Sequence, residues 1–304
     1  MNRPVLRTEL CDILGIEYPI MLAGMGVWGM GTPPELVAAV SDAGGLGVLG
    51  GSALSPEEVR RRIQRVRQMT DKPFGVDLLL PASLAKSSTT RTGVREDLSK
   101  NHPEHVKFMH GLLERFELTQ APVENDIVNS DEYAEAQIQV VLDEEVPIFA
   151  AGLGDPARII PRAREQNMVV IGLAGTVRHA ERNRDAGVDI VVCQGTEGGG
   201  HTGPVATLPL VSQAVEAIAP IPVVAAGGIT GGRGIAAALT LGAIGVWMGT
   251  AFLIAEEGGL PDTVKGDIVD GKATDFRISE AWTGKTLRAK KNVISDAWAE
   301  SGLK

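Results

Sequence analysis

The sequence predicts a closed (β/α)8 barrel, the TIM-barrel fold, on three observations. Short apolar segments alternate with amphipathic ones along most of the 304 residues. Strand and helix repeated in this way imply parallel strands joined by right-handed helical crossovers. Only 4% of residues are aromatic while 44% are apolar, so Ala, Val, Ile and Leu must build the core, as is typical of strands buried on both faces. The eight apolar segments favour a barrel, and an open doubly wound sheet is the alternative.

The predicted strands and helices follow one another in a regular order. The strands are Ile20–Ala23, Leu46–Leu49, Phe74–Leu79, Ile148–Ala151, Val169–Leu173, Ile190–Cys193, Val223–Ala226 and Ile244–Met248. The helices between them are Pro34–Ala43, Pro56–Met69, Glu132–Leu142, Pro156–Gln166, Val177–Ala186, Leu210–Ala219 and Gly234–Leu241. Several helices begin with a capping residue followed by proline, as at Ser55-Pro56, which is a start signal for a helix.

Two segments interrupt this order within a single predicted domain, residues 1–304. Residues 81–130 are an insertion after the third strand, polar and with one predicted helix near Glu104–Glu117. Because the insertion leaves from the carboxyl end of a strand, where barrels carry their active sites, we predict a lid over the substrate. A plain surface excursion is the alternative. Residues 257–304 are predicted to form a C-terminal helical extension, with helices that end in Trp298 and pack across the barrel.

Charge and composition exclude several classes of partner. A net charge of −9 argues against nucleic acid and against an anionic membrane surface. The sequence has neither an apolar signal segment at its start nor a run of about 18 apolar residues. Cys11 and Cys193 are interpreted as free thiols, which fits a reducing compartment. We therefore expect a soluble, cytoplasmic protein that acts on a small molecule, with a homo-oligomer left open.

Glycines follow the last two predicted strands, at positions suited to a phosphate. The seventh strand is followed by Gly227 and Gly228, the eighth ends at Met248 and is followed by Gly249 and Thr250, and both lead into helices. Glycine lets backbone N–H groups approach a phosphate, and a helix N-terminus adds a favourable dipole. In TIM barrels, phosphate sites often lie after strands seven and eight. The sequence thus predicts a phosphomonoester site, with plain tight turns as the alternative.

The segment after the sixth strand, 194–204, reads QGTEGGGHTGP and carries the candidate catalytic residue. So many glycines cost conformational entropy, which makes sense if the backbone lies flat against a ring system. His201 stands among them, with an ordinary pKa of about 6.5 that suits acid–base work near neutral pH. A surface histidine without function is the alternative.

The remaining histidines lack a comparable setting. His102, His105 and His110 lie in the insertion, and His179 lies on a predicted helix. Their spacing, with no cluster of carboxylates to support it, is not that of a metal site. We therefore expect no metal.

With these motifs in hand, the sequence resembles the nitronate monooxygenase (2-nitropropane dioxygenase) family. That family also holds the FMN-dependent enoyl-acyl-carrier-protein reductases. The matching segments cover most of the chain outside the insertion, with a weaker continuation at Thr283–Asn292. They are Ala38–Gly50, Lys72–Leu78, Gln194–Gly203, Val223–Gly234 and Gly242–Phe252.

The resemblance implies noncovalent FMN and assigns a role to each candidate residue. The flavin ring is expected against Gly24, Met25, Asp77, Gln194, Gly199 and Gly200. The FMN phosphate is expected near Gly227, Gly228, Met248, Gly249 and Thr250. His201 matches the catalytic histidine. Asp77 departs from the family, which commonly has Asn there, and no Pro precedes Met25.

The resemblance also sets the functional expectation. We expect an FMN-dependent oxidoreductase, a nitronate monooxygenase that oxidises alkyl nitronates with O2. The alternative within enzymes is an NAD(P)H-dependent flavin reductase of an enoyl thioester or acyl-CoA. The motif 198–207 looks closer to family members that act on acyl-CoA esters. An alternative of another class is a barrel that binds FMN without catalysis.

Overall fold

The barrel is present and its eight parallel strands close into a ring. The computed structural model describes residues 6–26, 31–52, 54–80, 91–119 and 130–303. The barrel strands are β1 (Ile20–Leu22), β2 (Gly47–Gly50), β3 (Phe74–Leu79), β4 (Ile148–Gly152), β5 (Val169–Ala174), β6 (Ile190–Gln194), β8 (Val223–Ala226) and β9 (Gly245–Met248). They pair in the order β1-β9-β8-β6-β5-β4-β3-β2. A parallel bridge between Met21 and Leu46 joins β1 back to β2, which confirms the predicted TIM barrel.

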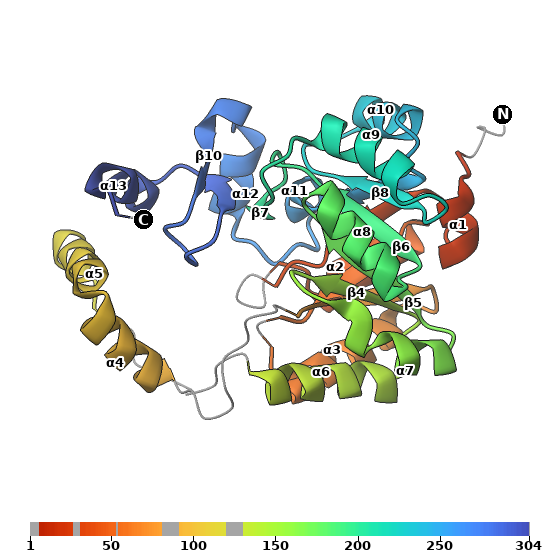
Figure 1. The fold of residues 1–304 in the computed structure, drawn as a ribbon, viewed down its shortest axis with the longest axis horizontal. Coiled ribbons are helices and arrows are strands. Elements are labelled where there is room, and N and C mark those ends of the chain that lie inside the picture. The colour runs from red at the N-terminus through yellow and green to blue at the C-terminus, as the bar shows by residue number, and fades with distance from the viewer. Residues whose placement is uncertain (1–5, 27–30, 53, 81–90, 120–129, 304) are drawn as a thin grey trace.

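Helices cover the outside of this ring (Figure 1). They are α2 (Pro34–Asp42), α3 (Pro56–Met69), α6 (Asp131–Asp143), α7 (Ile160–Glu165), α8 (Val177–Ala186), α9 (Thr207–Ala217), α10 (Gly232–Thr240) and α11 (Thr250–Leu253). The buried residues of α1 (Glu9–Leu14) pack instead with the apolar residues inside the barrel. The start of α3 is capped as its sequence indicates, since the Ser55 hydroxyl accepts from the N–H of Glu58 at 3.2 Å. None of the described helices has the length and apolar character needed to cross a membrane.

The core has two apolar layers, one inside the barrel and one between strands and helices. Met21, Val48 and Trp247 are among the inner residues, and Phe149 belongs to the outer layer. Successive residues of a strand point to opposite faces. On β3, Val76 and Leu78 pack in the outer layer, so Asp77 between them faces the inside of the barrel.

The C-terminal segment differs from the helical extension expected from sequence, because it also contains two strands. Besides α12 (Asp262–Val269) and α13 (Val293–Ser301), it forms β10 (Phe276–Ser279) and β11 (Leu287–Lys290). β11 pairs antiparallel both with β10 and with β7 (Gly200–His201), a two-residue strand in the loop after β6. The tail is thereby joined by hydrogen bonds to the loop that carries His201.

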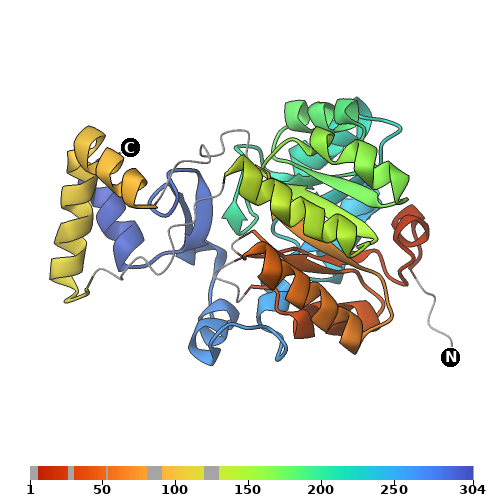
Figure 2. The ribbon, with the colours of Figure 1, turned by 90° about the horizontal axis from the view of Figure 1, so that it is seen from below.

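The last helix of the tail, α13, does not pack across the barrel as expected from sequence. The inserted segment forms α4 (Arg91–Asn101) and α5 (Pro103–Arg115), and α13 lies beside these helices, to one side of the barrel (Figure 2). The Trp298 ring contacts the rings of Phe108 and His105 on α5, with centroids 5.6 and 5.8 Å apart. These aromatic neighbours give Trp298 its apolar contact away from the barrel. Both ends of the predicted lid, residues 81–90 and 120–129, lie outside the described residues, so the lid stays a prediction.

Candidate active site

The predicted site residues gather at the carboxyl ends of the barrel strands, beginning with Gly24 and Asp77. Gly24 follows β1 and lies directly against the Asp77 side chain of β3. A Cβ atom at Gly24 would stand 2.3 Å from the Asp77 Cβ, so only glycine fits there. On the other side, a Cβ at Gly152 would stand 3.0 Å from Asp77 Oδ1. Two strand ends thus enclose one carboxyl group.

The Asp77 carboxyl is buried without full hydrogen bonding. Its side chain is 6% exposed, and Oδ1 has no hydrogen-bond partner among the described residues. Burial raises the pKa of Asp77 well above its ordinary value, while a hydrogen bond with the Gly152 backbone acts in the opposite direction. An unsatisfied buried polar atom costs about 1–3 kcal/mol. An unsatisfied oxygen at the rim that carries the active site in TIM barrels suits a hydrogen bond with a polar ligand.

Met25 is held where β1, β2 and β9 end. The Thr32 hydroxyl accepts from the N–H of Met25 at 3.3 Å and from that of Gly50 at 2.7 Å, and it donates to the Met25 carbonyl at 3.2 Å. A Cβ at Gly249 would stand 3.2 Å from the Met25 sulfur. Met25 and Gly249 are therefore neighbours. Thr32 is a positioning residue that sequence reasoning missed.

The glycine loop after β6 is organised by the Gln194 side chain. Its amide donates to the His201 carbonyl at 3.0 Å and to the Gly199 carbonyl at 3.4 Å. A Cβ at Gly199 would lie 3.5 Å from the Thr250 hydroxyl, so the loops after β6 and β9 meet. Gly200 has φ +76° and faces open space. Gly199, one of the predicted loop residues, is thus brought close to Thr250 at the start of α11.

His201 is held by the tail. In the β7–β11 pairing it stands opposite Leu287, and its Nε2 lies 2.9 Å from the Thr283 hydroxyl. Burial, and then the positive charge of Lys285, lower the pKa of His201 below its ordinary 6.5. Because its pKa lies below 6.5, the His201 imidazole is mainly neutral at pH 7 and can accept a proton. The weak family match that begins at Thr283 was the one sequence signal for this partner.

The two glycines of the predicted phosphate site adopt left-handed backbone. Gly227 has φ +102° and Gly228 has φ +71°, between β8 and the start of α10. Below them, the Glu197 carboxylate accepts from the N–H and hydroxyl of Thr207 at 2.9 and 2.8 Å. Burial acts to raise the pKa of Glu197, but hydrogen bonds from its own backbone and from Thr207 outweigh it and lower the pKa. The sequence did not predict these two bonds from Thr207, which orient the Glu197 carboxylate toward Thr207.

The two ends of the candidate site form separate groups of contacts. Asp77 belongs with Gly24 at β1 and β3, whereas His201 belongs with Gln194 and the tail. Met248 is buried at the end of β9 and precedes the loop that contacts Met25. A Cβ at Gly231 or Gly232 would meet open space, so the N-terminus of α10 is accessible to a ligand. This layout defines an enzyme of the TIM-barrel type with its active site at the carboxyl ends of the strands.

Comparison with known proteins identifies the family of barrel enzymes to which this chain belongs. The family model for nitronate monooxygenase matches residues 7–300. A Mycobacterium tuberculosis protein assigned as a monooxygenase is 37% identical, over 96% of this chain and 78% of its own length. The chain therefore belongs to the nitronate monooxygenase family, and it is an FMN-dependent oxidoreductase.

Solved structures of similar proteins support this family assignment. Nitroalkane oxidase from Streptomyces ansochromogenes has a TM-score of 0.82 and 31% identity, over 96% of this chain and 81% of that one. FabK from Thermotoga maritima has a TM-score of 0.75 and 33% identity, over 96% of this chain and 76% of that one. The residues described above fit FMN, since the rim offers an unsatisfied carboxyl at Asp77 and open backbone at Gly200, Gly231 and Gly232.

The raised pKa of Asp77 leads to a stability prediction. Replacing Asp77 with asparagine is expected to stabilise flavin-free protein more at pH 7 than at pH 5. The unfolded state loses the Asp77 proton above about pH 3.9, while the folded state keeps it up to its higher pKa. Across that window wild-type stability falls by about 1.4 kcal/mol per pH unit, and asparagine removes this loss.

Urea unfolding at pH 5, 6 and 7 would measure the difference between wild type and Asp77→Asn. Asp270→Asn is the matched control, because that residue is exposed. A difference for Asp77→Asn that is the same at all three pH values would mean that the folded protein holds Asp77 ionised.

Proposed function

We propose that the protein is a nitronate monooxygenase that oxidises alkyl nitronates with O2. The observation that carries this proposal is the setting of His201, a neutral imidazole fixed at the barrel rim by Thr283. The higher of the two TM-scores above, that of a nitroalkane oxidase, supports the same substrate class.

The proposal places FMN across the strand ends. Gly24, Met25, Asp77, Gln194, Gly199 and Gly200 would hold the flavin ring. Gly227, Gly228, Met248, Gly249 and Thr250 would surround the phosphate, whose charge suits the N-terminus of α10. The chemistry that FMN supplies is acceptance of electrons from the substrate and their delivery to O2.

The protein's own contribution is positioning and proton control. His201 would accept the carbon proton of the neutral nitroalkane, which yields the nitronate, or hydrogen-bond to a nitronate that is already formed, with Thr283 holding the ring at Nε2. Asp77 in its protonated form would donate a hydrogen bond toward the flavin ring, as the more usual asparagine amide would. This would restore a hydrogen-bond donor at Asp77, one of the positions where the sequence departs from the family's flavin-facing residues.

A second candidate is an NAD(P)H-dependent reductase of an enoyl thioester or acyl-CoA. The similarity to FabK, an enoyl-acyl-carrier-protein reductase, favours it. There the same histidine would assist protonation of the substrate while NAD(P)H supplies the electrons.

The flavin absorbance of purified protein under anaerobic conditions separates the two candidates. With an alkyl nitronate added, we expect the oxidised flavin band to bleach within seconds. Bleaching by NAD(P)H and not by nitronate would instead establish the reductase. Purified protein without a flavin band would contradict both.

A further inference from the structure

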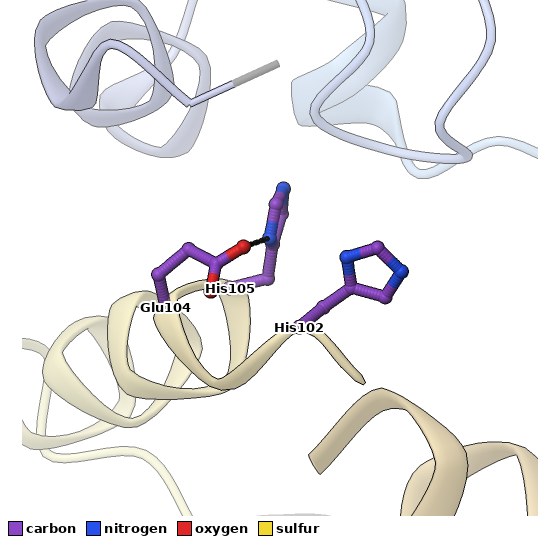
Figure 3. A group of neighbouring side chains, drawn as sticks. All are labelled: His102, Glu104 and His105. Carbon is purple, nitrogen blue, oxygen red and sulfur yellow. Dashed lines mark hydrogen bonds and ion pairs between the residues drawn. The ribbon is translucent and has the colours of Figure 1, made fainter. Parts of the chain in front are cut away.

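Three potential metal ligands come together at the start of α5, in the inserted segment. His102, Glu104 and His105 each offer one ligand atom, and all of these atoms lie within 4.8 Å of one another (Figure 3). His102 is the residue before the helix, with φ −136° and ψ 55°. This non-helical backbone brings its ring beside that of His105, with centroids 5.5 Å apart. Spacing alone did not predict the group, because it depends on where α5 begins.

The distances suit a small divalent cation. His105 Nδ1 lies 3.0 Å from Glu104 Oε1, close to the separation of two ligands that share one ion at about 2.0–2.2 Å from each. The ligand atom of His102 lies within 4.8 Å of those of Glu104 and His105. Two imidazoles with one carboxylate favour zinc and similar transition metals, whereas calcium and magnesium prefer oxygen ligands.

The group lies where the inserted segment meets the tail. The His105 ring contacts Trp298 of α13 at 5.8 Å between centroids, and Trp298 contacts Phe108 at 5.6 Å. In Figure 3 the side chains of His102 and His105 point from α5 toward the C-terminal segments. An ion bound here would therefore be next to an aromatic residue of α13, which follows the strand β11 that holds His201.

We propose that His102, Glu104 and His105 form a binding site for a divalent transition metal of the zinc class, located at the contact between α5 and α13. The carboxylate supplies negative charge, which offsets the unfavourable effect of the helix N-terminus on a cation. With three protein ligands, the ion keeps at least one position open to water.

Calorimetric titration of untagged full-length holoprotein with Zn²⁺ tests the ligand set. We expect one equivalent to bind, and about tenfold or weaker binding in His102→Gln and in His105→Gln. His110→Gln is the matched control, an exposed histidine on the same helix, and should bind as wild type. Flavin content and far-UV circular dichroism should be unchanged in all three variants. Failure of the wild type to bind more tightly than His102→Gln, or equal weakening by His110→Gln, would overturn the site.

A second measurement tests its position. Co²⁺ bound at this group should quench the fluorescence of Trp298, because the ring of one ligand contacts it. Trp298→Phe should bind Co²⁺ with the same stoichiometry but lose most of the quenching. Quenching of equal size in Trp298→Phe would show that the ion binds elsewhere.

Discussion

Replacing His201 with alanine is expected to lower turnover by about 10²-fold or more while the protein keeps its FMN. Burial and Lys285 lower the pKa of the His201 imidazole, which favours its neutral form, and its removal takes away the proton acceptor. The FMN contacts proposed for the loop come from Gln194 and glycine backbone, which the substitution leaves in place. Steady-state kinetics and the ratio of flavin to protein absorbance would measure the two effects.

The pH profile provides the control. Wild-type activity should fall as the pH drops through the His201 pKa, which lies below 6.5, because protonation removes the acceptor. In His201→Ala this acid limb should vanish. Thr283→Val keeps the imidazole but loses its 2.9 Å partner, so it should retain more activity and shift the limb. Wild-type turnover in His201→Ala would remove His201 from the mechanism.

Gly228→Asp is expected to give protein that purifies without flavin. Gly228 has φ +71°, and a Cβ there would come within 3.0 Å of the Glu197 Cβ. The substitution would therefore add backbone strain, crowding and a negative charge at the proposed phosphate position. Flavin absorbance after purification, and titration with added FMN, would measure the loss.

Gly302→Asp is the matched control for this variant. Gly302 has nearly the same backbone, φ +69°, but a Cβ there would meet open space at the end of α13. It should therefore bear the same strain and charge and still bind FMN. Normal FMN content in Gly228→Asp would show that the phosphate binds elsewhere.

The barrel was predictable because each of its parts has a local signal. Apolar runs such as Phe74–Leu79 mark strands buried on both faces, and capping residues such as Ser55 mark helix starts. The tail strands β10 and β11 have no such signal. All four residues of β11 are partly buried, without the alternation that identifies a strand, and its partners lie far away in the sequence.

Some features of the candidate site could also be predicted from local sequence, and others could not. Its glycines could be located because strand order places them at one rim, so Gly227 and Gly249 needed only a count of strands. The contacts between side chains could not be located, since they join residues distant in the chain. The enclosure of Asp77 by Gly24, the Thr32 bonds to Met25 and the Thr283 partner of His201 all depend on tertiary packing. Asp77 differs from these cases, because the sequence alone distinguishes it: it stands where the family that the chain resembles commonly has asparagine.

The pairing of β7 with β11 also bears on how the enzyme is made. Every barrel strand has been synthesised once Met248 has been added, yet Thr283, the partner of His201, is 82 residues beyond the histidine itself. At about 5–20 residues per second, translation needs roughly 2 to 7 seconds to cover the 35 residues from Met248 to Thr283. During this interval a nascent barrel can form its core and its glycine loops while His201 lacks its tail partner. The loop that carries His201 can therefore acquire its tail contacts only after synthesis has passed the tail strands.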